Sequence, residues 1–255
     1  MARERGIQWA IELNLELIMF LDSDDLLFPN AVQALTHEIN HGRYDFVMSE
    51  IVTERGNEPQ FTIKGENALT WHHGTIYRVK FLKDKDIHFM PGLRTNEDLA
   101  FNLCTYYATE NKATIDAQLY LWRNDSDSIT RTDSPLKRKC NGTDYIKATW
   151  WAYQYCHRTQ VKSFERLAPN LLCCYNYYQL TIERGDEMEP IIIEYLKDLA
   201  TAEEFQQLFS NINIWRKMSH NIWPYAYYNK RLYAFHQTFY DWWIALGGKD
   251  VFSGD

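Results

Sequence analysis

The sequence lacks the features that mark membrane-spanning, exported and disulfide-stabilised proteins. No run approaches the roughly 18 consecutive apolar residues of a membrane-spanning helix. The opening residues, MARERGIQWAIELN, lack the apolar core of a signal peptide. The five cysteines form no C-x-x-C pair, and their odd number fits neither a disulfide framework nor a zinc ribbon. We therefore expect a cytoplasmic protein with reduced thiols, with contact at a membrane surface as an alternative for its aromatic-rich C-terminal part.

Positive charge is also scarce, and its distribution excludes a class of partner. The net charge is −7, from 27 basic and 34 acidic side chains. Residues 1–135 carry 13 basic and 21 acidic side chains, so the acidic excess lies in the first half. A protein that binds nucleic acid through its phosphates needs the opposite sign over a broad face, so we expect no nucleic-acid partner. The hydrophobic share of 45% and the charged share of 24% are those of an ordinary globular protein.

The periodicity of apolar residues predicts an α/β domain at 1–135 and a helical, aromatic-rich region at 136–255. Five consecutive apolar residues at 17–21 favour a strand buried on both faces, as in a parallel sheet. Beyond residue 135 the alternation typical of strands stops. The other expected elements of the first domain are helices at 4–13, 29–42 and 96–109 and strands at 45–53, 61–63, 74–79 and 117–123.

Acidic residues follow the first predicted strand directly, in the string Asp22-Ser23-Asp24-Asp25. In open α/β sheets, ligands bind at the carboxyl ends of strands. Carboxylates this close together cannot comfortably ionise unless a cation lies among them. Mg²⁺ or Mn²⁺, held by oxygen ligands and shared with a diphosphate, would meet that need. The alternative is a helix-capping aspartate followed by solvated acidic side chains.

Three ordered segments resemble the family 2 glycosyltransferases of the GT-A fold, and together they span about residues 2–131. The resemblance implies a partial GT-A-like mixed sheet with flanking helices, followed by an all-helical C-terminal region. It also implies an inverting, metal-dependent transfer of a sugar from a nucleotide-sugar to a hydroxyl acceptor. The matching strings are ARERGI, IMFLDSDD and PNA at 2–7, 18–25 and 29–31, then GTIYR and GLRTNEDLAF at 74–78 and 92–101, then LYLWR and DSIT at 119–123 and 127–130.

Residue roles follow from this resemblance. Asp22 and Asp24 match the metal-binding D-x-D, which implies Mn²⁺ or Mg²⁺ as the cofactor. Asp98, in the pair with Glu97, matches the base that takes the proton from the acceptor hydroxyl. The alternative is that Glu97 and Asp98 have no catalytic role and that their negative charges only stabilise the N-terminus of the helix. The remaining candidates are Asp25, as a second ligand or an acceptor contact, and Arg123, whose guanidinium suits phosphate oxygens.

The family's opening strands, which hold the nucleotide, have no counterpart before Met1 in this sequence. Three explanations stay open: a partner chain supplies that half, the reading frame was truncated, or the fold was rebuilt for a task without a nucleotide. The corresponding alternatives to an enzyme acting alone are half of a split enzyme and a non-catalytic scaffold or glycan-binding protein. The aromatic excess of the C-terminal region makes a homo-oligomer a further expectation.

A rival motif, His37-Glu38-Ile39-Asn40-His41, has the H-E-x-x-H spacing of zinc hydrolases on a predicted helix. The helix ends directly after it, at Gly42, and no third ligand stands out downstream. A zinc hydrolase is therefore a remote alternative. The apolar face of this helix is expected to comprise Val32, Leu35 and Ile39.

Two adjacent histidines, His72 and His73, precede the strand predicted at 74–79. They either line an acceptor pocket or serve the fold. Neighbouring residues of a strand point to opposite faces, which favours the structural role.

Overall fold

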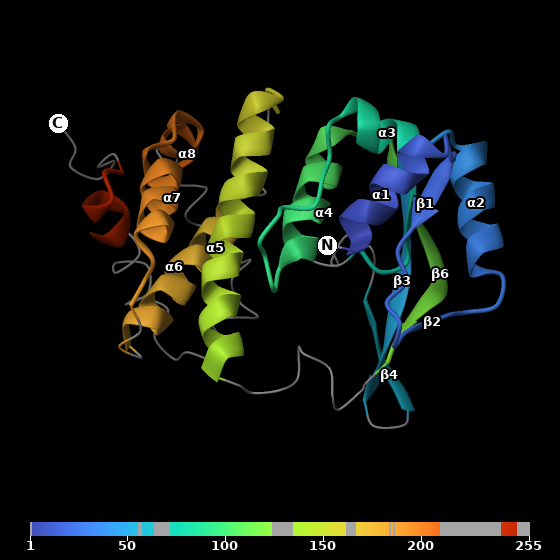
Figure 1. The fold of residues 1–255 in the computed structure, drawn as a ribbon, viewed down its shortest axis with the longest axis horizontal. Helices are drawn as coiled ribbons and strands as arrows, with labels where there is room; N and C mark the ends of the chain where they lie inside the picture. The colour runs from blue at the N-terminus through green and yellow to red at the C-terminus, as the bar shows by residue number, and fades with distance from the viewer. Residues whose placement is uncertain are drawn as a thin grey trace. The chain divides into compact units, whose positions relative to one another are not determined.

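The structure is a computed structural model that describes residues 2–55, 58–63, 72–123, 135–161, 167–183, 185, 187–209 and 241–248. Contacts divide the chain into two compact units, unit 1 (Met1–Lys137) and unit 2 (Arg138–Asp255). Figure 1 shows the elements of both, and each unit is described by itself. The DSIT string at 127–130 and all of the aromatic residues between 215 and 240 lie outside the described residues.

Unit 1 is built on a six-stranded mixed sheet, with the strand order β1-β5-β3-β6-β2 and with β4 paired to β3. The β3–β6 pair is parallel, and the other four described pairs are antiparallel. This mixed α/β architecture confirms the predicted fold class. The strands are β1 (Leu17–Met19), β2 (Leu26–Leu27), β3 (Phe46–Arg55), β4 (Glu58–Ile63), β5 (Thr75–Arg78) and β6 (Lys112–Trp122).

Helices cover the sheet from two sides, with α2 on one and α1 and α4 on the other (Figure 1). The buried stripe of α2 consists of Ala31, Leu35 and Ile39, spaced four residues apart. Val32, predicted to share that stripe, is 56% exposed because one residue turns it about 100° away. The helices are α1 (Ala2–Glu12), α2 (Ala31–His41), α3 (Val79–Asp84), which the sequence did not predict, and α4 (Glu97–Ala108).

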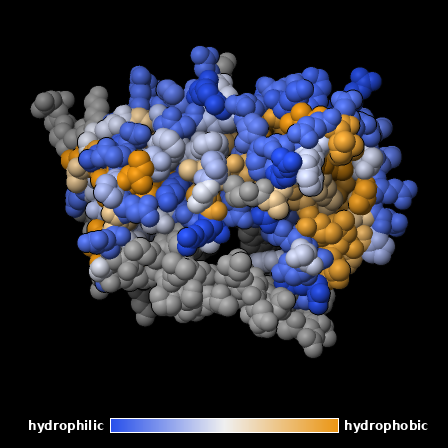
Figure 2. Space-filling view, viewed as in Figure 1, coloured by the Kyte–Doolittle hydropathy of each residue, from blue (hydrophilic) through white to orange (hydrophobic). Residues whose placement is uncertain are grey.

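The first strand departs from its prediction. β1 spans Leu17–Met19, is half-buried, and pairs antiparallel with β5 rather than lying inside a parallel sheet. An apolar run indicates that a strand is covered by other parts of the protein, but it does not say whether one face or both faces are covered. In the structure, β1 lies at the end of the described strand order. Apolar side chains gather over the part of unit 1 where β1 and β2 lie (Figure 2). Three of the exposed ones are Leu15, Leu21 and Leu26.

The regular elements of unit 2 in its described part are all helices, and several of its aromatic residues are buried. Trp150 stacks on Tyr195 with ring centroids 4.0 Å apart. Trp242 and Trp243 are both buried. No helix among the described residues has the length and apolarity needed to cross a bilayer. The helices are α5 (Pro135–Arg158), α6 (Ala168–Glu183), α7 (Pro190–Thr201) and α8 (Glu203–Phe209), with a further helical turn at 241–245.

The described cysteines are free thiols whose environment suppresses their reactivity. Burial raises the pKa of Cys156 to about 12, and it also raises the pKa of Cys173 and of Cys174. Because the thiolate is the reactive form, we expect Ellman's reagent at pH 8 to label native Cys140→Ser protein at least about 100-fold more slowly than the same protein unfolded in urea. Equal rates would contradict the buried placement.

Candidate functional site

The acidic string after β1 forms a tight turn, in which the backbone N–H of Asp25 donates to the carbonyl oxygen of Asp22 at 3.1 Å. Asp25 is 5% exposed, and burial raises its pKa. Its carboxylate accepts hydrogen bonds from the Tyr120 hydroxyl at 2.6 Å and from the Arg123 backbone N–H at 3.0 Å. Asp25 therefore ties the acidic turn to the end of β6.

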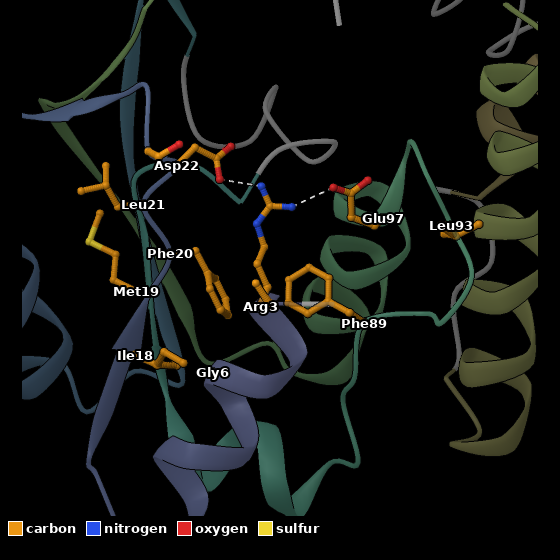
Figure 3. A pocket seen from close by; sticks show the side chains of 12 residues that line it. Arg3, Gly6, Ile18, Met19, Phe20, Leu21, Asp22, Phe89, Leu93 and Glu97 are labelled. Atoms are coloured by element: carbon orange, nitrogen blue, oxygen red, sulfur yellow. Dashed lines mark hydrogen bonds and ion pairs between the residues drawn. The ribbon is translucent and has the colours of Figure 1, made fainter. Parts of the chain in front are cut away.

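Arg3, on the first turn of α1, joins the acidic turn to α4. Its guanidinium donates to Asp22 Oδ1 at 2.6 Å, to Glu97 Oε1 at 2.7 Å and to Asp98 Oδ1 at 3.3 Å. Figure 3 shows the guanidinium between Asp22 and Glu97. Burial alone would lower the pKa of Arg3, but the three carboxylates raise it overall. One cation thus holds together carboxylates that lie about 75 residues apart in the chain.

Asp98 lies in the first turn of α4, where the helix dipole favours a negative charge. The helix begins after Asn96, whose φ of 60° turns the chain sharply. Burial would raise the pKa of Asp98, but His72 and Arg3 outweigh it and lower the pKa overall. Asp98 is therefore ionised at neutral pH, the state in which a carboxylate can accept a proton.

The two adjacent histidines lie side by side, contrary to the expectation that they face opposite ways. Their rings stack with centroids 4.7 Å apart, at 26° between planes. The chain at His72–Gly74 is a turn rather than a strand, and Gly74 takes a φ of +64°, so strand alternation does not apply. His72 is fully buried and His73 nearly so.

Both imidazoles reach the acidic residues. The His72 Nδ1 atom lies 3.0 Å from Asp98 Oδ1, and His73 Nε2 lies 3.4 Å from Asp22 Oδ2. The hydrogen bond with His73, together with Arg3, keeps the pKa of Asp22 far below its usual range despite burial. The sequence assigned no role to Arg3 and favoured a purely structural one for the histidine pair. The signal available was the glycine after the two histidines, which marks a turn.

A pocket of about 590 Å³ opens beside this cluster. Its polar lining consists of Arg3, Asp22, Ser23 and Glu97. Apolar side chains such as Phe20 and Phe89 line much of the rest (Figure 3). This volume and this mixture of many apolar and few polar groups are typical of small-molecule sites.

The structure places the other predicted residues away from the centre of the cluster. Asp24 occupies a central position of the acidic turn and is half-buried. Within the described part of the chain, the ligand atoms that group within 4.8 Å belong to Asp22, His72 and His73, and Asp24 is outside that group. The Arg123 side chain is exposed.

The H-E-x-x-H motif lies on α2, and its histidines are not among the ligand atoms that group with Asp22. The rings of His37 and His41 stack, with centroids 5.8 Å apart, on the exposed side of the helix. Among the residues that the structure describes, no third ligand joins them. The geometry gives no support to a zinc hydrolase.

Comparison with known proteins identifies the fold. No protein-family model matches the sequence, and no curated protein matches it. Solved structures of TarS from S. aureus, a glycosyltransferase with a GT-A-like fold, do resemble it. Residues 1–349 of TarS in complex with UDP give a TM-score of 0.51 at 16% identity, over 81% of this chain and 61% of that one.

Two further TarS structures agree with the first. The complex with UDP-GlcNAc gives a TM-score of 0.53 at 15% identity, over 78% of this chain and 60% of that one. TarS 1–349 by itself gives a TM-score of 0.52 at 17% identity, over 78% and 59%. At these identities the likeness defines the fold alone, a partial GT-A-like one. The chain spans about 60% of the length of these structures.

Proposed function

We propose that this protein is an inverting glycosyltransferase that moves a sugar from a nucleotide-sugar to a hydroxyl acceptor. The observation that carries the proposal is the Arg3 bridge, which holds the acidic turn and the ionised Asp98 together beside a pocket of about 590 Å³. The glycosyltransferase-like fold supports it, and the TarS complexes with UDP and UDP-GlcNAc favour a uridine diphosphate donor.

In this proposal Asp98 is the catalytic base. Its carboxylate accepts the proton of the acceptor hydroxyl while that oxygen attacks the anomeric carbon. The bond from the anomeric carbon to the diphosphate breaks in the same displacement, so the configuration inverts. Glu97 holds Arg3, and Arg3 keeps Asp98 charged and oriented. Asp25 and Arg123, joined at the end of β6, are proposed to contact the acceptor or the diphosphate.

The proposed cofactor is Mn²⁺ or Mg²⁺. The D-x-D pattern gives Asp22 and Asp24 as its ligands, and the ligand atoms grouped in the structure give Asp22 with His72 and His73 as the alternative. The ionised state of Asp22 fits a cation at this position. When bound, the metal would neutralise the diphosphate and stabilise it as a leaving group.

We also propose that a partner chain covers the apolar surface over β1 and β2. The exposed side chains there include Leu15, Leu21 and Leu26, about half exposed each. Contiguous apolar surface of this kind is costly to leave in water. The proposed partner would pack apolar side chains of its own on this surface.

Calorimetric titration with UDP and UDP-sugars in the presence of Mn²⁺ tests the proposal, for this chain alone and together with the product of a neighbouring gene. We expect saturable binding that Asp22→Asn weakens by about 10-fold or more, since it removes a metal ligand. Glu110→Gln, at a side chain 98% exposed, is the matched control. If no heat of binding is seen, either for this chain alone or with the neighbouring gene product, the enzyme proposal fails and a non-catalytic scaffold is favoured.

A further inference from the structure

We propose that Asp22, His72 and His73 form a binding site for a divalent transition-metal ion such as Mn²⁺, Co²⁺ or Zn²⁺. Each residue offers one ligand atom, and the three atoms lie within 4.8 Å of one another. The sheet makes this possible because β1, which precedes Asp22, pairs with β5, which follows the two histidines. An ion about 2.0–2.2 Å from each of these atoms would require the side chains to move inward.

The state of His72 is the second observation that points to a metal. Its side chain is fully buried. Nδ1 lies 3.0 Å from Asp98 Oδ1, whereas Nε2 has no hydrogen-bond partner within the described residues. A buried polar group without a hydrogen bond is costly, and a metal ion would supply the missing partner. The nearby Asp98 carboxylate would then hold the ring in place, as second-shell carboxylates do for metal-bound histidines.

Asp22 is arranged to serve such an ion. Arg3 holds its Oδ1 atom at 2.6 Å, which leaves Oδ2 on the side of His73, at 3.4 Å. Three carboxylates, those of Asp22, Glu97 and Asp98, surround the single guanidinium of Arg3. The negative charge that remains is of the sign and size that a divalent cation balances.

The donor set selects the kind of metal. Imidazole nitrogens suit first-row transition metals and zinc, whereas Mg²⁺ prefers an octahedron of oxygen ligands. A site with two imidazoles and one carboxylate therefore favours Mn²⁺, Co²⁺ or Zn²⁺ over Mg²⁺. That the bound ion would lie beside a diphosphate rests on the proposed function. The binding of the ion by itself does not depend on that function.

Cobalt titration tests the site, followed by visible absorption and by calorimetry. The background is the His37→Gln/His41→Gln double variant, because exposed histidines four residues apart on α2 can bind metals by themselves. We expect one Co²⁺ per chain, bound at least about 10-fold more tightly than Mg²⁺. His73→Gln and Asp22→Asn should each weaken binding by about 10–100-fold, while Glu110→Gln, at an exposed carboxylate outside the cluster, leaves it within about 3-fold.

Two results would overturn the site. The first is equal affinity of the background protein for Co²⁺ and Mg²⁺. This measurement leaves Asp22, His72 and His73 unchanged, so it remains valid even if a variant of His72 or His73 fails to fold. The other is loss of Co²⁺ binding in Asp24→Asn with retention in folded His73→Gln, which would assign the metal to the D-x-D oxygens. Intact Co²⁺ binding without any binding of UDP would remove the proposed function and leave the metal site standing.

Discussion

Replacing Asp98 by asparagine should lower the rate of sugar transfer by about 10²–10⁴-fold, the usual contribution of a general base. The amide keeps the size of the carboxylate, so the contacts of this position with His72 and Arg3 change little in shape. It cannot accept the proton of an acceptor hydroxyl. Release of UDP from UDP-sugars in the presence of Mn²⁺ measures the effect, and calorimetry with UDP should show unchanged affinity.

The control for this experiment is Asp86→Asn, an exposed carboxylate of the same unit that lies outside the pocket lining. Its rate should stay within about 2-fold of the original, since surface substitutions away from special features have small effects. Full activity of Asp98→Asn would remove the base assignment. A parallel loss of UDP affinity would instead show that Asp98 acts in binding.

Replacing Phe101 by alanine should lower the free energy of unfolding by about 3–5 kcal/mol, the usual cost of removing a buried phenylalanine ring. Phe101 is fully buried and stacks on Phe89, with centroids 4.2 Å apart. It also meets the edges of Phe20 and Tyr77, at 5.8 and 5.4 Å. Urea denaturation followed by circular dichroism measures the loss.

This aromatic cluster also supports the site, because Phe20 packs edge-on against His72 with centroids 5.5 Å apart. The matched control is Val32→Ala, which removes apolar atoms from a side chain that is 56% exposed. It should cost no more than about 0.5 kcal/mol. Similar losses in the two variants would contradict the buried packing of Phe101.

Local signals were sufficient to predict much of unit 1. The apolar run before Asp22 predicted a strand, and β1 lies there. The acidic pair Glu97 and Asp98 predicted the start of a helix, and α4 begins there. The prediction for the buried face of α2 was wrong at Val32, which is apolar but exposed, and right at Leu35 and Ile39. The histidine pair was misinterpreted because the strand pattern was extended across a turn that ends at Gly74.

By itself, the sequence determined the α/β class of the first part, the helical character of the second, and the positions of the acidic residues at the ends of elements, because each depends on neighbours within a few residues. The tertiary structure decided which of these residues meet. Arg3 reaches Asp22 and Glu97, and His73 reaches Asp22, only through the pairing of β1 with β5 and the packing of α1. Such contacts join residues up to about 95 positions apart, and strand register and helix packing, which local patterns do not specify, determine them.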